Sequence, residues 1–480
     1  MESGVEKDLT PRPAARPDRR AVVQWWVLAG ALAGCVVLGG ALMTMPAGQH
    51  RPPPAPGPVA RAETAVGAGA PASLPDLDAL IGDHEAHLRA HPGDARSWAV
   101  LGAAYVQRGE RASQARYYPR AEKALRTSLK ARPKGNAEAL GGLAALANAR
   151  HDFRTARTWG EAAVAASPKR WTAYPPLIDA YRGLGDYKAA RGTLAELVRL
   201  PSGSRTAKAQ VLTRAGLVYR DQGRREDSAA AFSDAAALAS APAERADCLV
   251  LAGELAWERG EPAESLRAFE AALRADPGAD AARAGQGRAL AALGRTSGAL
   301  RAYRSALAGR PLPRYALELG ELYESLGRGG AAREQYEVVR ARVREGATGG
   351  VDDALVLGLF EADHGDAGSA VRRLRGEWAR HPSVAVADAL GWALHRAGED
   401  EEALGFATKA MDREHGGEVR VALYAYHRGV IERELGRLGA ARRHLGEALR
   451  VNPVFSPLFA PLASAALEEL GELGEPPQGA

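Results

Sequence analysis

The sequence predicts an all-α protein, an α-solenoid of about ten helix pairs with a C-terminal capping helix, preceded by a single transmembrane helix. Composition is the first observation: Ala, Gly, Arg and Leu dominate, whereas Phe (7), Met (4) and Cys (2) are scarce. Helices must therefore pack closely over small side chains. From residue 74 to 471 apolar residues follow a helical period, and the pattern returns about every 34 residues. A repeat array can reach this length without one enlarging core.

The N-terminal 45 residues divide into a polar and an apolar part. Residues 1–20 are rich in Pro and Arg without helical or strand period, and we expect a disordered tail. Residues 21–45 carry no charge and would extend about 37 Å as a helix, enough for a hydrocarbon core of about 30 Å. Basic residues near the apolar run are more numerous on its N-terminal side. This bias predicts a single-pass anchor in the cell membrane with a cytoplasmic N-terminus and an extracytoplasmic array.

Two alternatives exist for the apolar run. Residues 32–35 read LAGC, which resembles the lipobox of bacterial lipoproteins and would make Cys35 an acylated N-terminus. The chain stays apolar after Cys35 (VVLGGALMTM), whereas a mature lipoprotein continues into a polar tether, so an intact anchor is favoured. A globular core helix is disfavoured, because the run is apolar on all faces.

A linker and a short tail flank the predicted array. Residues 46–73 contain a cluster of prolines followed by Ala and Gly, which predicts an extended spacer. The array then occupies residues 74–471, where LDALIGDHEAHLRAHP is expected to be a lone second helix. Residues 472–480 are expected to be disordered.

The repeat frame places small and turn residues at fixed positions. Residues 249–277 align with 283–311, so that Gly253 matches Gly287 and Phe269 matches Tyr303. Small residues in the first helix of each pair should allow close approach of the second. A turn residue after the first helix should adopt the left-handed conformation, which favours glycine. The predicted turn residues are Gly109, His151, Gly185, Gly223, Gly260, Gly294, Gly327, Gly365, Gly398 and Gly436.

This period and alphabet resemble the tetratricopeptide repeat family. The first full copy has the family's opening pattern WxxLGxxY at Trp98, Leu101, Gly102 and Tyr105. The resemblance implies a right-handed solenoid and a scaffold that binds a protein or peptide. The segments DALGWALHRAGEDEEALGFATKAM and AYHRGVIERELGRLGAARRHLGEALRVNPVFSPL also resemble membrane-anchored tetratricopeptide proteins of actinobacteria, which implies a bacterial envelope setting.

The concave face, lined by the first helices, is the expected partner-binding surface. Arg beside aromatic rings is typical of peptide and protein recognition. The chaperone-binding subtype is disfavoured, because it needs a Lys and Asn clamp and only Asn136, Asn148 and Asn452 are present. The predicted partner-binding residues are Arg182, Arg220, Trp257, Arg288, Trp392, His395, Arg396, Tyr426, His427 and Arg433, and the densest cluster lies between 392 and 427.

Other functions find less support. The repeats leave no room for a catalytic domain, and nucleotide-binding and nucleophile motifs are absent, so we expect no enzyme, cofactor or small-molecule substrate. A net charge of +5 from 63 basic and 58 acidic residues is too balanced to indicate nucleic acid. His84, His87 and His91 share one helical face and are weak metal candidates, which leaves a metal-handling accessory protein as one alternative. A cytoplasmic regulator is the other.

Overall fold

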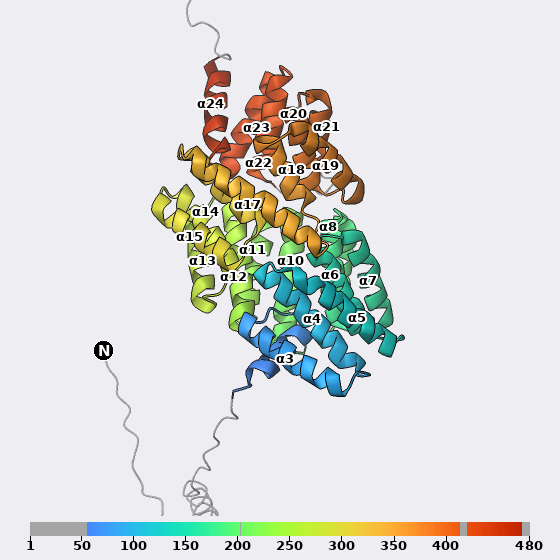
Figure 1. The fold of residues 1–480 in the computed structure, drawn as a ribbon. Coiled ribbons are helices and arrows are strands. Elements are labelled where there is room, and N and C mark those ends of the chain that lie inside the picture. The colour runs from blue at the N-terminus through green and yellow to red at the C-terminus, as the bar shows by residue number, and fades with distance from the viewer. Residues whose placement is uncertain (1–54, 202, 413–419, 473–480) are drawn as a thin grey trace, which may run out of the picture. The chain divides into compact units, whose positions relative to one another are not determined.

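The computed structural model describes residues 55–201, 203–412 and 420–472, and from Gly57 onward these belong to one compact unit (Figure 1). The predicted tail 1–20, the apolar run 21–45 with Cys35, and residues 473–480 lie outside the described residues. None of the helices in the described ranges is both long and apolar enough to cross a membrane.

The described secondary structure is helical throughout, which confirms the all-α prediction. Short helix α2 (Pro58–Gly67) and α3 (Leu74–Ala90) begin it, and α24 (Phe459–Glu472) ends it. Between them lie ten successive helix pairs, as the repeat frame predicts. They are α4 (Ala95–Ala112) with α5 (Tyr118–Ala131), α6 (Ala137–Ala149) with α7 (Phe153–Ala166), α8 (Tyr174–Gly183) with α9 (Tyr187–Arg199), α10 (Arg205–Asp221) with α11 (Arg225–Leu238), α12 (Pro242–Glu258) with α13 (Pro262–Ala275), α14 (Asp280–Ala292) with α15 (Thr296–Gly309), α16 (Pro313–Ser325) with α17 (Gly329–Thr348), α18 (Ala354–His364) with α19 (Ala367–Arg380), α20 (Val384–Arg396) with α21 (Asp400–Lys409), and α22 (Ala422–Glu434) with α23 (Leu438–Val451).

Small residues let the two helices of a pair approach closely. A Cβ added to Gly253 would lie 2.7 Å from Cε1 of Phe269, and one added to Gly287 would lie 2.7 Å from Cδ2 of Tyr303. Both distances are well inside van der Waals contact, so any side chain at these glycines would displace a buried ring. In both pairs a glycine of the first helix therefore lies against an aromatic ring of the second helix, as the repeat frame predicts.

The turn positions follow the prediction in eight of ten pairs. Seven predicted glycines, from Gly185 to Gly436, have positive φ, and His151 adopts φ 60°. The prediction is wrong at Gly109, because α4 continues to Ala112 and the left-handed residue is Ser113 (φ 51°). It is also wrong at Gly365, whose φ is −141°.

The predicted spacer 46–73 is in part helical. Residues Pro58–Gly67 form α2, whose Ala62, Ala65 and Val66 are buried in the same apolar cluster as Leu77 of α3. Pro58 occupies the first helical position, where its missing N–H costs nothing. The expectation of an extended chain is wrong over these ten residues, and α3 is not a lone helix because it packs on α2.

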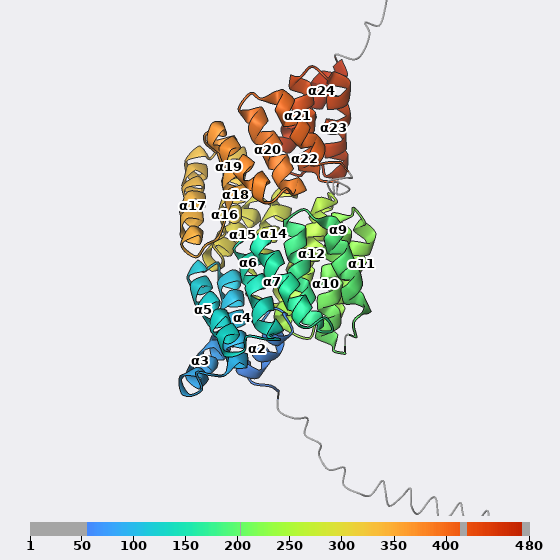
Figure 2. The same cartoon turned by 90° about the vertical axis from the view of Figure 1, so that its right-hand side faces the viewer.

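The solenoid winds far enough for later repeats to contact earlier ones. Arg150 and His151, at the turn of the second pair, donate to the backbone oxygens of Gly349 and Asp352 (both 2.9 Å), between the seventh and eighth pairs. Arg154 of the second pair donates to Arg380 O (3.0 Å), between the eighth and ninth pairs. The orange helices α18 and α19 accordingly lie beside the blue-green helices α6 to α8 (Figures 1 and 2).

The spacing of these contacts is regular. The turn of the third pair, at Gly185, meets Pro382 between the eighth and ninth pairs, and the turn of the fifth pair, at Gly260, meets Val451 after the tenth. Each of these three turns thus lies against the joint that follows the repeat five positions later. One superhelical turn takes between five and six repeats, and the inner face is correspondingly narrow.

Candidate partner-binding cavity

Ion pairs between successive first helices line the inner face. Arg214 of α10 contacts Asp179 of α8 (3.0 Å), and Arg182 of α8 contacts Asp221 of α10 (2.5 Å). Arg220 of α10 then pairs with Glu258 of α12. Each pair joins residues 35 to 39 positions apart, which is one repeat. Arginines and carboxylates about one repeat apart in sequence therefore form a ladder of charges across successive first helices.

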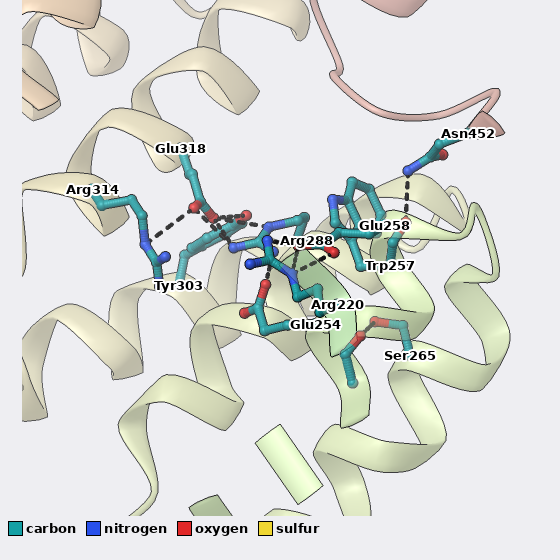
Figure 3. Close-up of polar contacts among 11 residues, drawn as sticks. Arg220, Glu254, Trp257, Glu258, Ser265, Arg288, Tyr303, Arg314, Glu318 and Asn452 are labelled. Carbon is teal, nitrogen blue, oxygen red and sulfur yellow. Dashed lines mark hydrogen bonds and ion pairs between the residues drawn. The ribbon is translucent and has the colours of Figure 1, made fainter. Parts of the chain in front are cut away.

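Arg288 is the centre of this ladder. From α14 it contacts Glu254 of α12 (2.7 Å) and Glu318 of α16 (2.9 Å), and its guanidinium lies over the ring of Trp257 at 5.6 Å (Figure 3). Burial alone would lower the pKa of Arg288, but the two carboxylates outweigh it and raise this pKa well above its usual value. Tyr303 adds a hydrogen bond from its hydroxyl to Glu318 (2.9 Å). Arg288 thus fixes three consecutive first helices relative to one another.

A cavity of about 760 Å³ lies against this part of the ladder. One wall is formed by the first helices α12, α14, α16 and α18, and the other by the start of α22 and the chain from Asn452 to Ser464. Asn452, which is buried, donates from Nδ2 to the carbonyl of Trp257 (2.8 Å) and so joins the two walls (Figure 3). The apolar lining includes Leu317, Leu322, Leu326, Leu359, Leu423, Phe455 and Phe459.

The charged lining of the cavity is mostly acidic. Two arginines, Arg288 and Arg314, face five carboxylates: Glu254, Glu258, Glu318, Glu321 and Asp363. Asp363 accepts from Trp392 Nε1 (2.9 Å) and lies 3.6 Å from Arg396. Glu321 differs from the other four, because it has no hydrogen bond or ion pair within the described part of the chain. Burial, together with the charges of Asp363, Glu318 and Glu324, raises the pKa of Glu321 to about 8.

The densest predicted cluster is brought together but is not exposed. Trp392 stacks on His427 with ring centroids 4.2 Å apart, and Tyr426 stacks on Phe459 at 5.3 Å. Trp392, Tyr426 and His427 are 3%, 4% and 1% exposed. The expectation that these three side chains project from the face is wrong, because α24 and the segment before it cover them. Only His427 lines the cavity.

The remaining predicted residues lie on the inner face or beside it. Arg182, Arg220, Trp257 and Arg288 occupy the ladder, so their charges and rings are already engaged within the chain. The other three have partners of their own. His395 contacts Asp400 (2.5 Å), Arg396 donates to Ala362 O (3.2 Å), and Arg433 contacts Glu469 (2.9 Å).

The three histidines of α3 and the residue that follows it do not converge on one point. His84 is buried at 8% exposure, His87 contacts Asp94 (3.1 Å), and His91 stacks on His87 at 4.4 Å. Across the described residues no group of three or more His, Cys, Asp or Glu side chains is placed to hold a metal ion. This geometry gives the metal-handling alternative no support.

Among the acidic partners, Asp179 and Glu254 are placed on the concave face by the repeat frame of the sequence. Glu258 and Glu318 were missed by the sequence reasoning, and so was the second wall. Glu258 and Glu318 could have been found, because each lies about one repeat from its arginine: 38 residues from Arg220 and 30 from Arg288. Phe455 and Phe459 carry no such signal. They reach the cavity only through the winding of the solenoid.

Comparison with known proteins bears on the repeats directly. The model of the tetratricopeptide repeat family matches residues 213–280, 250–313 and 285–347. These matches support the predicted resemblance of the repeats to the tetratricopeptide repeat family. They fall on α10 to α17, which contain the Arg288 ladder and one wall of the cavity. No curated protein matches the chain.

The solved structures that match the chain include the following three. A tetratricopeptide repeat protein from Parabacteroides merdae is 16% identical, with a TM-score of 0.32 over 55% of this chain and 99% of that one. The Thermus thermophilus tetratricopeptide protein TTC0263 is 24% identical, with a TM-score of 0.34 over 39% of this chain and 98% of that one. Human IFIT1, solved as a dimer with m7Gppp-AAAA, is 14% identical, with a TM-score of 0.42 over 66% and 71%.

Proposed function

We propose that this chain is a membrane-anchored scaffold that binds a segment of a partner protein in the cavity on its inner face. The cavity carries the proposal. Its volume of about 760 Å³ falls within the roughly 300–1,000 Å³ of typical ligand sites. It combines an apolar wall with a few polar groups, which is the usual composition of a recognition site. Tetratricopeptide repeats are in general protein-interaction modules and typically non-catalytic, in keeping with a protein partner and no reaction.

The narrow inner face also favours a flexible peptide segment over a folded domain as the partner. Because one superhelical turn takes fewer than six repeats, the inner face is narrow and much of its charge is paired within the chain. An extended peptide fits such a space, and its backbone can hydrogen-bond with cavity side chains that a globular surface would not reach.

The anchor and the compartment rest on sequence. The apolar run 21–45 would hold the chain in the cell membrane, with the N-terminus cytoplasmic and the repeats outside. Protease added to intact cells should digest the repeats, whereas their survival would place them in the cytoplasm. Mass measurement of the membrane-bound chain decides between the intact anchor and acylation at Cys35: a chain beginning at an acylated Cys35 would replace the spanning helix by a lipid anchor.

Photo-crosslinking tests the binding site. A benzoylphenylalanine at Leu326, which lines the cavity and is 37% exposed, should form an adduct with the partner in cells. The matched control is the same residue at Val198 of α9, which is 58% exposed and lies on a second helix. Adducts at Leu326 that are absent at Val198 support the cavity. Equal adducts at both positions, or none at Leu326, would contradict it.

A further inference from the structure

We propose that the cavity recognises a basic side chain, arginine or lysine, carried by an apolar peptide segment, and that Glu321 and His427 receive its N–H groups. This inference rests on the proposed peptide-binding function and names the chemistry of the peptide. Three independent features of the cavity lead to it: an uncompensated carboxylate, an orphaned histidine nitrogen and an aromatic wall.

Glu321 is the uncompensated carboxylate. The other carboxylates of the cavity each have a cation nearby. Arg288 forms ion pairs with Glu254 and Glu318, and Arg220 forms one with Glu258. Asp363 lies 3.6 Å from Arg396. Glu321 has neither a cation nor a hydrogen-bond donor among the described residues, although it faces the same space. A ligand cation would complete the ladder at this position with a charge-assisted hydrogen bond.

His427 supplies the second acceptor. Its Nδ1 lies 3.0 Å from both carboxylate oxygens of Asp388, so Nδ1 carries the proton that is donated to them. In the neutral ring Nε2 is then an acceptor. This atom is buried and has no partner within the described residues, and His427 is among the residues that line the cavity. A buried acceptor without a donor is costly, and an N–H from a ligand would satisfy it.

The walls fit the rest of the ligand. Phe455 and Phe459 line the cavity, and aromatic faces attract a guanidinium or ammonium group. Leu317, Leu359 and Leu423 offer apolar surface for the residues beside the basic one. An acidic peptide would meet more carboxyl groups than arginines in the cavity lining, and is disfavoured on that ground.

Binding of a cation in this cavity should release a proton from Glu321. The raised pKa of Glu321 means that its carboxyl is protonated in the empty cavity at neutral pH, and a bound cation would lower that pKa and expel the proton. The charges that raise it are Asp363 of α18 and Glu318 and Glu324 of α16, and the other ionisable groups of the cavity are Glu254, Glu258, Arg288, Arg314 and His427. Affinity should therefore rise by up to about tenfold per pH unit between pH 6 and 8 and level off above pH 8.

Panning the full-length chain with random nine-residue peptides tests the proposal. The enriched peptides should carry Arg or Lys flanked by apolar residues. Glu321→Gln keeps the shape and should weaken their binding by roughly 10- to 100-fold at pH 8 and abolish the pH dependence. The matched control is Glu334→Gln on α17 of the same repeat, an exposed glutamate without a partner among the described residues, which should change nothing.

The outcomes distinguish recognition of a basic side chain from the peptide-binding function on which it rests. Enriched peptides without a basic residue, or equal binding by the wild type and Glu321→Gln, would overturn the proposed charge recognition while peptide binding stands. Spermidine is added as a competitor. If it displaces a labelled enriched peptide as effectively as the same unlabelled peptide does, the ligand is a free polyamine, and the proposal that a peptide carries the basic group is overturned. If no peptide is enriched and no adduct forms at Leu326, the scaffold function itself fails.

Discussion

Replacing Arg288 with methionine removes the cation that joins α12, α14 and α16 while keeping much of the side-chain volume. Glu254 and Glu318 would then lie in a partly buried site without their main partner. Breaking a buried ion pair by removing one member costs about 3–5 kcal/mol. The side chains of Arg288, Glu254 and Glu318 are 15%, 26% and 19% exposed, and water will offset part of that cost. We expect a loss of about 2–4 kcal/mol in the free energy of unfolding at pH 7.5.

The loss should depend on pH, because it originates in the carboxylates. In the wild type, burial acts to raise the pKa of Glu254, but Arg288 and Arg314 lower it overall. A lowered folded-state pKa stabilises the fold above the unfolded-state value of about 4.3, and this stabilisation is lost as the pH falls through the folded-state pKa. Without Arg288 burial dominates and raises the pKa of Glu254. The difference between variant and wild type should therefore shrink as the pH falls toward about 4.3.

Urea denaturation followed by circular dichroism measures the loss, and hydrogen exchange locates it, since a repeat array need not unfold in one step. Faster exchange should be confined to α12, α14 and α16. The triple variant Arg288→Met, Glu254→Gln, Glu318→Gln should recover most of the stability, because no unpaired charge remains. A single variant that loses less than about 0.5 kcal/mol, the usual range of a surface change, would refute the role given to Arg288. So would a loss that is equal at pH 4.5 and 7.5.

Three further substitutions test the packing of the solenoid. Gly287→Ala should cost about 1–3 kcal/mol, because its Cβ would meet the buried ring of Tyr303, whose hydroxyl is held by a hydrogen bond; Gly405→Ala, which meets nothing within 4 Å in the middle of a helix, should instead stabilise by up to about 1 kcal/mol. Thermal unfolding of both variants checks the signs, and a stabilised Gly287→Ala would contradict the close packing. Asn452→Ala should cost about 1–3 kcal/mol and speed exchange at the C-terminal end of α12, because the carbonyl of Trp257 keeps only the N–H of Gly260 as a donor and the hydrogen bond between the two walls is lost. Unchanged exchange there would show that this contact does not hold the two walls together.

The helix pairs could be predicted because their determinants are local. A small residue such as Gly253, an aromatic one such as Phe269 and a turn glycine recur within 34 residues, and each acts on its immediate neighbour in the chain. The one departure from glycine at a matched turn has a structural reason. His151 adopts the left-handed conformation and uses its side chain to reach Asp352 O, which glycine could not do.

The winding of the solenoid could not be predicted, because it depends on small rotations between repeats that accumulate along the chain. Its consequences were therefore missed. Trp392 and Tyr426 belong to first helices and would be exposed on the concave face of an open array, but here α24 and the chain before it cover them. The cavity has the same origin, since its two walls lie almost 200 residues apart in sequence.

The same winding links binding to the shape of the array. A ligand in the cavity would touch α12, α14 and α16 on one side and the segment after α23 on the other, so it would bridge two successive superhelical turns. In the free protein the described hydrogen bond that joins these walls runs from Asn452 to Trp257. A peptide that contacts both walls should therefore slow hydrogen exchange on each of them, and not only on the first helices that carry the acidic groups. Protection confined to α12, α14 and α16 would mean that the ligand lies on an open face and that the covering segment takes no part in recognition.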